Sequence, residues 1–232
     1  MRDLAFTLYD LVAYFVPGAI VVWALTELAG RMGLCVQSIT TLPETALVVV
    51  ALAAIYAMGH ALHAIANLTI DFLPFGGYPP RNYFPKQFEN DFQEPFRTTL
   101  YGHIVRSFHV QGTRQPGDSI AVVSGSVNDT VKNAYWACYT VVAQSKPNSL
   151  VQVFSSMSGL CRGLCVGCFV IALAYLVGSF LLNSLTLLIV VAVALGAGCL
   201  FLNRAMRFKR YLTRTVYSDF LYTNKELLSD KK

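Results

Sequence analysis

The sequence is short of charged residues for its length. Only 13% of its 232 residues are Asp, Glu, Lys or Arg, and 55% are hydrophobic. Soluble domains average about 25% charged residues. The shortage excludes an ordinary soluble domain and favours a chain that lies largely in a membrane.

Short patterns that mark many enzymes are also lacking. The sequence holds no nucleophile elbow, no phosphate-binding glycine loop, no H-E-x-x-H and no carboxylate pair. It has six cysteines but no loop-borne disulfide framework, and Cys165, Cys168 and Cys199 lie inside apolar runs, where Cys behaves as a small hydrophobe. We therefore expect reduced thiols, no enzyme activity, no cofactor and no catalytic residue.

Four long apolar stretches are present instead. Each approaches the roughly 20 residues that a helix needs to span a bilayer; they cover about 8–29, 45–69, 160–183 and 185–203. The first is too long for a signal peptide, and Asp3 stands in its flank, which is why we expect an uncleaved first span. The sequence predicts an all-α membrane protein with four transmembrane helices and a mainly helical cytoplasmic insert between helices 2 and 3.

Four segments follow from this layout. They are a first transmembrane helix pair at 1–70, a cytoplasmic insert and candidate sensor domain at 71–158, a second transmembrane hairpin at 159–203, and a basic helical tail at 204–232. Lys and Arg are concentrated in the insert and in the tail, whereas the connection between spans 3 and 4 has none. The positive-inside rule then makes the insert and both termini cytoplasmic. We expect a multi-pass membrane protein with cytoplasmic N- and C-termini.

Helices are also expected outside the four spans. Within the insert they cover about 95–110 and 128–144, and a third begins near Pro147 and runs without a breaker from about 148 to 183. The fourth span can continue into the tail, where Phe208, Leu212, Val216 and Phe220 recur every four residues. These extensions would connect the cytoplasmic segments to the membrane helices as levers.

The second span carries a polar stripe. Its members follow at spacings of 4, 3, 4 and 4, which is one helical face: Tyr56, His60, His63, Asn67 and Asp71. Ionisable residues within a span are costly and point to a water-filled pathway or a gate. The alternative is a set of hydrogen bonds that holds neighbouring helices together. A metal site is disfavoured, because two histidines fall short of the three or four ligands that zinc takes.

The first span offers further candidates for the pathway or gate. Asp10 and Tyr14 stand four residues apart, and Pro17-Gly18 follow near the expected middle of the span. Proline removes one helical hydrogen bond and kinks the helix. Pro17 and Gly18 could form a hinge or simply a packing feature. A solvated carboxylate is the alternative interpretation of Asp10.

Aromatic and basic residues alternate through the insert. Arg81, Tyr83, Arg97 and Arg106 are candidates for ligand binding, since such residues stack on bases and neutralise phosphates. The alternative is a small aromatic core that lies at the membrane interface.

Cysteines and glycines alternate at the start of the third span. The spacing of Cys161, Cys165 and Cys168 can hold an iron–sulfur cluster, but at 4 and 3 residues it also places small side chains on one helical face. Gly163 and Gly167 form a small-xxx-small surface for close helix contact, either within the chain or between copies. We expect packing and no metal.

Some segments resemble a known group of proteins. Tyr9 to Gly18 at the first span, Arg162-Gly163-Leu164 at the third, and Arg207 to Tyr211 with Val216-Tyr217 in the tail resemble small bacterial four-helix membrane effectors of anti-phage defence, which include the channel-like effector of the Hailong system. The resemblance covers both membrane pairs. It implies an oligomeric channel that depolarises the infected cell, controlled by a nucleotide or oligonucleotide bound in the cytoplasm.

Two functions stand as the main hypotheses, and a third, an intramembrane hydrolase, would need a metal at His60 and His63. One is a homo-oligomeric, ligand-gated ion channel of antiviral defence. The other is a membrane anchor or scaffold whose insert and tail recruit a cytoplasmic partner protein. Under both hypotheses membrane lipid is a partner, and anionic lipid would attract the basic tail.

Overall fold

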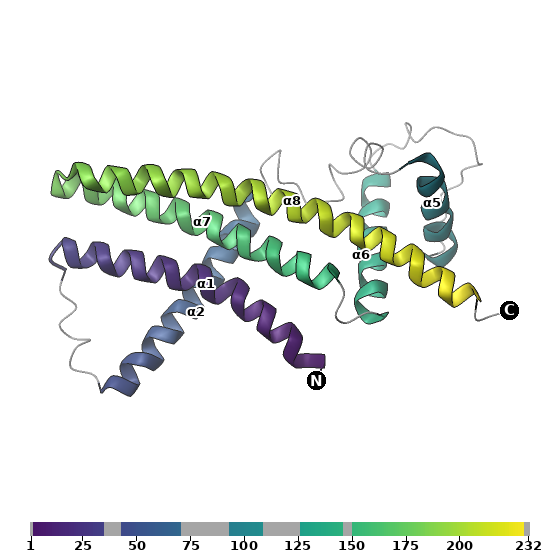
Figure 1. Ribbon diagram of the computed structural model, residues 1–232, viewed down its shortest axis with the longest axis horizontal. Helices are drawn as coiled ribbons and strands as arrows, with labels where there is room; N and C mark the ends of the chain where they lie inside the picture. The colour runs from purple at the N-terminus through teal and green to yellow at the C-terminus, as the bar shows by residue number, and fades with distance from the viewer. Residues whose placement is uncertain (1, 35–42, 71–92, 109–125, 146–149, 230–232) are drawn as a thin grey trace. The chain divides into compact units, whose positions relative to one another are not determined.

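A computed structural model describes residues 2–34, 43–70, 93–108, 126–145 and 150–229 (Figure 1). These residues form six helices and no strand, which confirms the all-α prediction for the described part of the chain. The helices are α1 (Arg2–Arg31), α2 (Glu44–Ile70), α5 (Glu94–Phe108), α6 (Ser126–Ser145), α7 (Leu150–Leu182) and α8 (Leu185–Ser229).

Four of these helices are long and apolar enough to cross a membrane, as a multi-pass membrane protein requires. They are α1 from Val12, α2, α7, and α8 as far as Thr223. The four expected spans are thus confirmed as helices. The single helix expected over 148–183 is also confirmed, because α7 runs for 33 residues, and α8 continues past the apolar stretch into the tail. The location of the insert on the cytoplasmic side of the membrane remains a prediction.

The chain divides into two compact units by its internal contacts. Unit 1 comprises residues 1–72 and 156–208, and unit 2 comprises residues 73–155 and 209–232. Helices α7 and α8 contribute residues to both units. Each unit has a hydrophobic core of its own.

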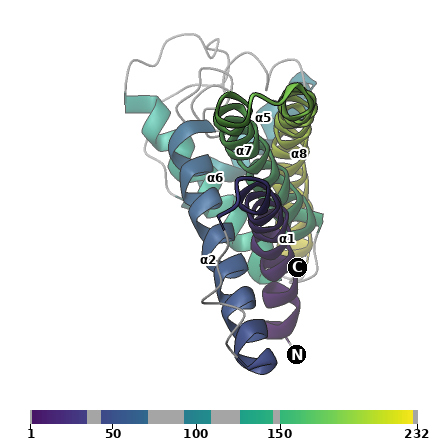
Figure 2. The same ribbon diagram turned by 90° about the vertical axis from the view of Figure 1, so that its left-hand side faces the viewer.

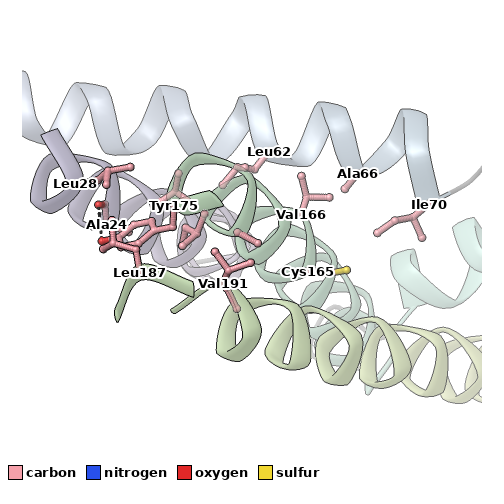
Figure 3. Close-up of a cluster of buried hydrophobic side chains, with 14 residues drawn as sticks. Ala24, Leu28, Leu62, Ala66, Ile70, Cys165, Val166, Tyr175, Leu187 and Val191 are labelled. Atoms are coloured by element: carbon pink, nitrogen blue, oxygen red, sulfur yellow. Dashed lines mark hydrogen bonds between the residues drawn. The ribbon is translucent and has the colours of Figure 1, made fainter. Parts of the chain in front are cut away.

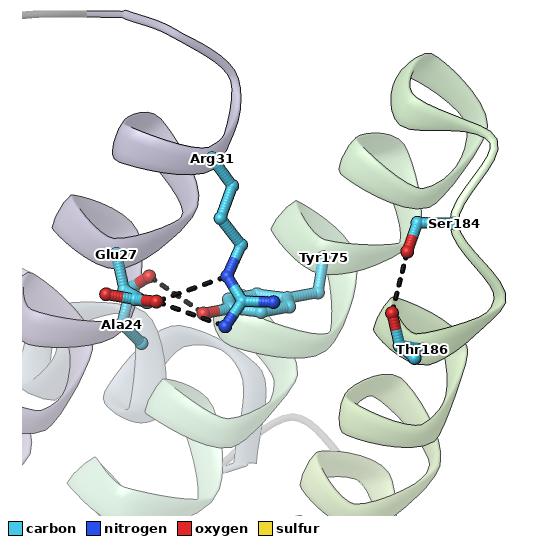
Figure 4. Close-up of polar contacts among 6 residues, drawn as sticks. All are labelled: Ala24, Glu27, Arg31, Tyr175, Ser184 and Thr186. Carbon is cyan, nitrogen blue, oxygen red and sulfur yellow. Dashed lines mark hydrogen bonds and ion pairs between the residues drawn. The ribbon is translucent and has the colours of Figure 1, made fainter.

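The core of unit 1 lies between α1, α2, α7 and α8. Val21 of α1, Leu62 of α2 and Leu187 of α8 are almost completely buried. Cys165 of α7 belongs to the same cluster, and Figure 3 shows it with Leu62 and Leu187. Tyr175 crosses this core and donates a hydrogen bond from its hydroxyl to the Ala24 carbonyl at 3.1 Å (Figure 4). A buried tyrosine hydroxyl needs such a partner, so this bond fixes α7 against α1.

A tight connection joins α7 to α8. Asn183 adopts a φ of 45°, a left-handed conformation that Asn tolerates better than most residues. The Ser184 amide donates to the Ser179 carbonyl at 3.2 Å, and the Ser184 hydroxyl lies 2.7 Å from that of Thr186 (Figure 4). The expected helical hairpin is confirmed, with these residues satisfying groups at both helix ends.

Two glycines bring α1 and α2 into backbone contact. A Cβ atom on Gly18 would lie 2.0 Å from the Ile55 carbonyl oxygen, and one on Gly59 would lie 2.0 Å from that of Tyr14. No side chain fits at either position, so the two helices touch through their backbones. Beyond this crossing, the N-terminal half of α2 leads away from α7 and α8 in both views (Figures 1 and 2).

Unit 2 has a core built from α5, α6, the start of α7 and the end of α8. Leu100, Tyr135, Val142 and Val151 are buried in it, together with α8 residues. On α8, Val216 and Phe220 are buried and Leu212 packs against them, which confirms the apolar stripe predicted for these positions in the tail.

Cys138 lies at the centre of this core and is fully buried. Burial raises the pKa of its thiol from 9.0 to about 12. The thiol therefore stays protonated at neutral pH in the folded chain. The stability that follows is complete below about pH 9 and is lost as the pH rises towards 12, because the unfolded chain ionises first.

The glycine crossing predicts a sharp difference between two substitutions. Gly59→Ala drives a Cβ into the backbone of α1, and we expect it to cost about 1–3 kcal/mol of stability, as overpacking does. Gly30→Ala is the matched control, since no atom lies within 4 Å of its Cβ position. Thermal unfolding of both variants in detergent measures the difference. Equal midpoints for the two would contradict the crossing.

Cys138 gives a second test. We expect a variant that retains only this cysteine to react with a maleimide at pH 8 roughly a hundredfold or more slowly than an exposed thiol, because its thiolate is scarce. Thr140→Cys in a background without other cysteines is the control, since Thr140 is exposed on the same helix. Mass spectrometry follows the labelling, and denaturation in dodecyl sulfate should abolish the difference. Equal labelling of the native variants would contradict the burial of Cys138.

Candidate functional site

Aromatic rings gather where α1 crosses α2. The ring of Tyr14 stacks on His60, with centroids 4.2 Å apart and planes at 18°. The same tyrosine meets the edge of His63 at 4.9 Å. The structure therefore brings together three residues predicted for a pathway or gate, one from the first span and two from the second.

Tyr56 extends this cluster along α2. Its ring meets His60 edge-on, with centroids 4.4 Å apart and planes at 77°. His60 is exposed, and Tyr56 is 47% exposed. The outer part of the polar stripe thus lies on the surface of the single chain, while His63 is half-buried between helices.

Arg162 of α7 completes the site. It is only 8% exposed, and its Nη2 donates to the Asn67 side-chain oxygen at 2.8 Å and to the Ala66 carbonyl at 3.3 Å. A bond from a charged donor is worth about 1.5–3 kcal/mol. Arg162 therefore fastens the last turn of α2 to α7.

Glycines of α7 allow this close approach. A Cβ on Gly159 would lie 3.5 Å from Cε1 of His63, and one on Gly163 would lie 3.0 Å from Cγ of Pro17. Gly167 lies beside Val21 in the same way. The small-xxx-small surface of Gly163 and Gly167 therefore packs against α1 of the same chain.

The contact between Pro17 and Gly163 locates the site along the bundle. Gly163 precedes Asn183 by about 20 residues, or roughly 30 Å of helix. The cluster thus lies near the end of unit 1 that is remote from the α7–α8 connection. The mid-span position expected for Pro17 and Gly18 stays a prediction.

Helix α1 continues through Pro17, which is buried. The helix changes direction partway along its length (Figure 1). A proline within a helix removes one hydrogen bond and produces such a bend. The hinge function of Pro17 and Gly18 stays a prediction.

The structure describes the remaining predicted site residues only in part. Arg97 pairs with Glu94 one turn earlier on α5, and its side chain is only 15% exposed. Asp10 lies in α1 and Arg106 in α5, but their side chains are outside the described part. Arg81, Tyr83 and Asp71 lie outside the described residues altogether, so the ligand site of the insert remains a prediction.

Metal ligands do not gather in the described part of the chain, where no group of three or more His, Cys, Asp or Glu residues occurs. Cys165 is buried in the core of unit 1. What the cluster offers is phenol, imidazole, amide and guanidinium groups, which donate or accept hydrogen bonds.

Sequence reasoning missed Arg162 as a member of the site. A signal was available, because Arg162 is the only charged residue between Leu150 and Asn203. A lone charge in an apolar run marks a buried partner or a functional site. Its pairing with Asn67 could not be deduced from spacing.

Comparisons with known proteins add nothing to this site. No family model matches the chain, and no curated protein or solved structure matches it either.

The bond between Arg162 and Asn67 predicts energetic coupling. Asn67→Ala removes the amide acceptor, and we expect a loss of about 1.5–3 kcal/mol in stability. In a double-mutant cycle with Arg162→Gln, the coupling energy should fall within about 0.5–3 kcal/mol. Asn203→Ala, at an exposed asparagine of α8, is the matched control. Thermal unfolding in detergent provides the measurement, and additive effects would refute the coupling.

Proposed function

We propose that this chain is an oligomeric membrane effector, an ion channel of the bacterial inner membrane. Its opening is controlled by a nucleotide-type or oligonucleotide ligand bound on the cytoplasmic side, and it acts in anti-phage defence by depolarising the membrane. The resemblance to four-helix defence effectors motivates the biological role. The surface of α2 supports the channel.

The observation that carries the proposal is the exposure of α2. Only 11% of its apolar window is buried, yet its exposed residues include Tyr56 and His60. Lipid covers apolar side chains but cannot satisfy polar groups, whose burial in hydrocarbon is costly. This face therefore needs water or another copy of the chain.

A pore through one copy is disfavoured by its packing. Residues such as Val21, Leu62 and Leu187 fill the interior of unit 1, and protein interiors of this kind hold few voids larger than a water molecule. The pathway must then lie between copies, with the polar face of α2 turned towards it. Several α2 helices around an axis would give it a lining of Tyr56 and His60.

Gating follows from the joint at which α1, α2 and α7 meet. Tyr14, His63 and Arg162 tie the three helices together near one end of unit 1, and the buried Pro17 lies in α1 three residues after Tyr14. A ligand that moves α7 would change this joint and with it the tilt of α2. The cytoplasmic insert is the proposed sensor, and α7 is the proposed transmission.

Ion flux from liposomes tests the proposal. We expect His60→Ala with His63→Ala to change the unitary conductance at least twofold, because His60 would line the pathway and His63 joins α2 to α1 beside it. His103→Ala, on α5 in unit 2, is the matched control and should leave the conductance unchanged. The channel proposal would be refuted if correctly inserted protein carried no current with any nucleotide or oligonucleotide tested.

A scaffold is the second candidate. Exposed aromatic side chains in unit 2, Trp136 and Tyr222, favour a protein partner because aromatic residues are enriched in interfaces. Stable capture of one partner that Trp136→Ala abolishes, together with full activity after the His60 and His63 substitutions, would favour this function over the channel.

A further inference from the structure

Arginines follow one another along one face of α8. Arg204, Arg207 and Arg210 are each separated by three residues, so successive side chains are rotated by about 60° and shifted by about 4.5 Å along the axis. All three are exposed. They form what we call the arginine face of α8.

The arginine face has no acidic counterpart in the described part of the chain, where none of its members forms an ion pair. The closest acidic residue in sequence on α8 is Asp219. By contrast, Arg31 and Arg97 pair with Glu27 and Glu94 on their own helices. The three positive charges are therefore available to an external anion.

The position of this face along α8 identifies the anion. The run from Leu185 to Asn203 contains no charged residue and is about 28 Å long as a helix. That length matches the hydrocarbon core of a bilayer, which is about 30 Å thick. If this run spans the hydrocarbon core, Arg204 would stand where the hydrocarbon ends, and Arg207 and Arg210 would reach into the layer of lipid phosphates.

We propose that the arginine face of α8 is a binding surface for anionic phospholipid headgroups, of the phosphatidylglycerol type, in the leaflet that it enters. Guanidinium groups bind phosphate oxygens through two parallel hydrogen bonds, and their long stems lie along apolar surface. Attraction to anionic lipid amounts to about a fivefold gain in affinity for each basic residue near the membrane. This surface does not depend on the channel function.

The test counts lipids retained by the full-length protein. Protein purified in detergent is mixed with equal amounts of phosphatidylglycerol and phosphatidylcholine, and native mass spectrometry counts each lipid bound. We expect the wild type to retain the anionic lipid with a preference of roughly tenfold or more. This preference should fall as salt is raised, because salt screens exposed charges.

Three variants sharpen the result. A triple variant should lose the preference for phosphatidylglycerol, with a ratio close to one; it combines Arg204→Gln, Arg207→Gln and Arg210→Gln. A triple variant with Lys at the same three positions should retain most of the preference. Arg31→Gln, at an arginine already paired with Glu27, is the matched control and should change nothing. If the Gln variant fails to fold, the lipid preference of the wild type and its salt dependence still test the proposal.

Three outcomes would overturn the proposal. The first is a wild-type protein that does not distinguish the two lipids. The second is a folded Gln variant that distinguishes them as well as the wild type. The third is a thermal stabilisation by inorganic phosphate as large as that by phosphatidylglycerol at equal concentration, which would assign the face to a free ion.

Discussion

Contact between two backbones determines how the first two helices of this chain are arranged. At Gly18 and Gly59 there is no room for a Cβ, so α1 and α2 approach more closely than any pair of larger residues allows. A glycine has no side chain to bury, but it allows van der Waals contact between the two main chains. Such packing is a principal attraction between helices in lipid. Because the crossing is short, most of α2 remains outside the core.

The polar cluster depends on that crossing. Tyr14 reaches both His60 and His63 only because the helix backbones are so close, and Arg162 reaches Asn67 because α2 continues past α7 at the angle that the crossing imposes. Packing and polar bonding, which the sequence offered as alternatives to a pathway, are both present here. His63 and Asn67 join helices, whereas Tyr56 and His60 lie on the outer surface.

Much of the helical organisation could be predicted from the sequence, because apolar length and helical periodicity are local signals. The four spans, the helices near 95–110 and 128–144, and the stripe of Val216 and Phe220 all follow from such signals. The partner of Arg162 and the contact of Gly18 with Gly59 could not, because they depend on how distant helices cross. Arg81 and Tyr83 stay predictions outside the described residues.

The partners of Arg162 also constrain how the chain is assembled. Arg162 and Ala66, whose carbonyl it binds, are 96 residues apart in sequence. Helix α2, which carries the acceptors, is synthesised before α7. When α7 leaves the ribosome, a folded α1–α2 pair can already offer the Ala66 carbonyl and the Asn67 amide. Arg162 can then bond to acceptors that are already in place, and α8 follows across the tight connection. Biogenesis therefore has a preferred order, from the N-terminal pair to the C-terminal hairpin.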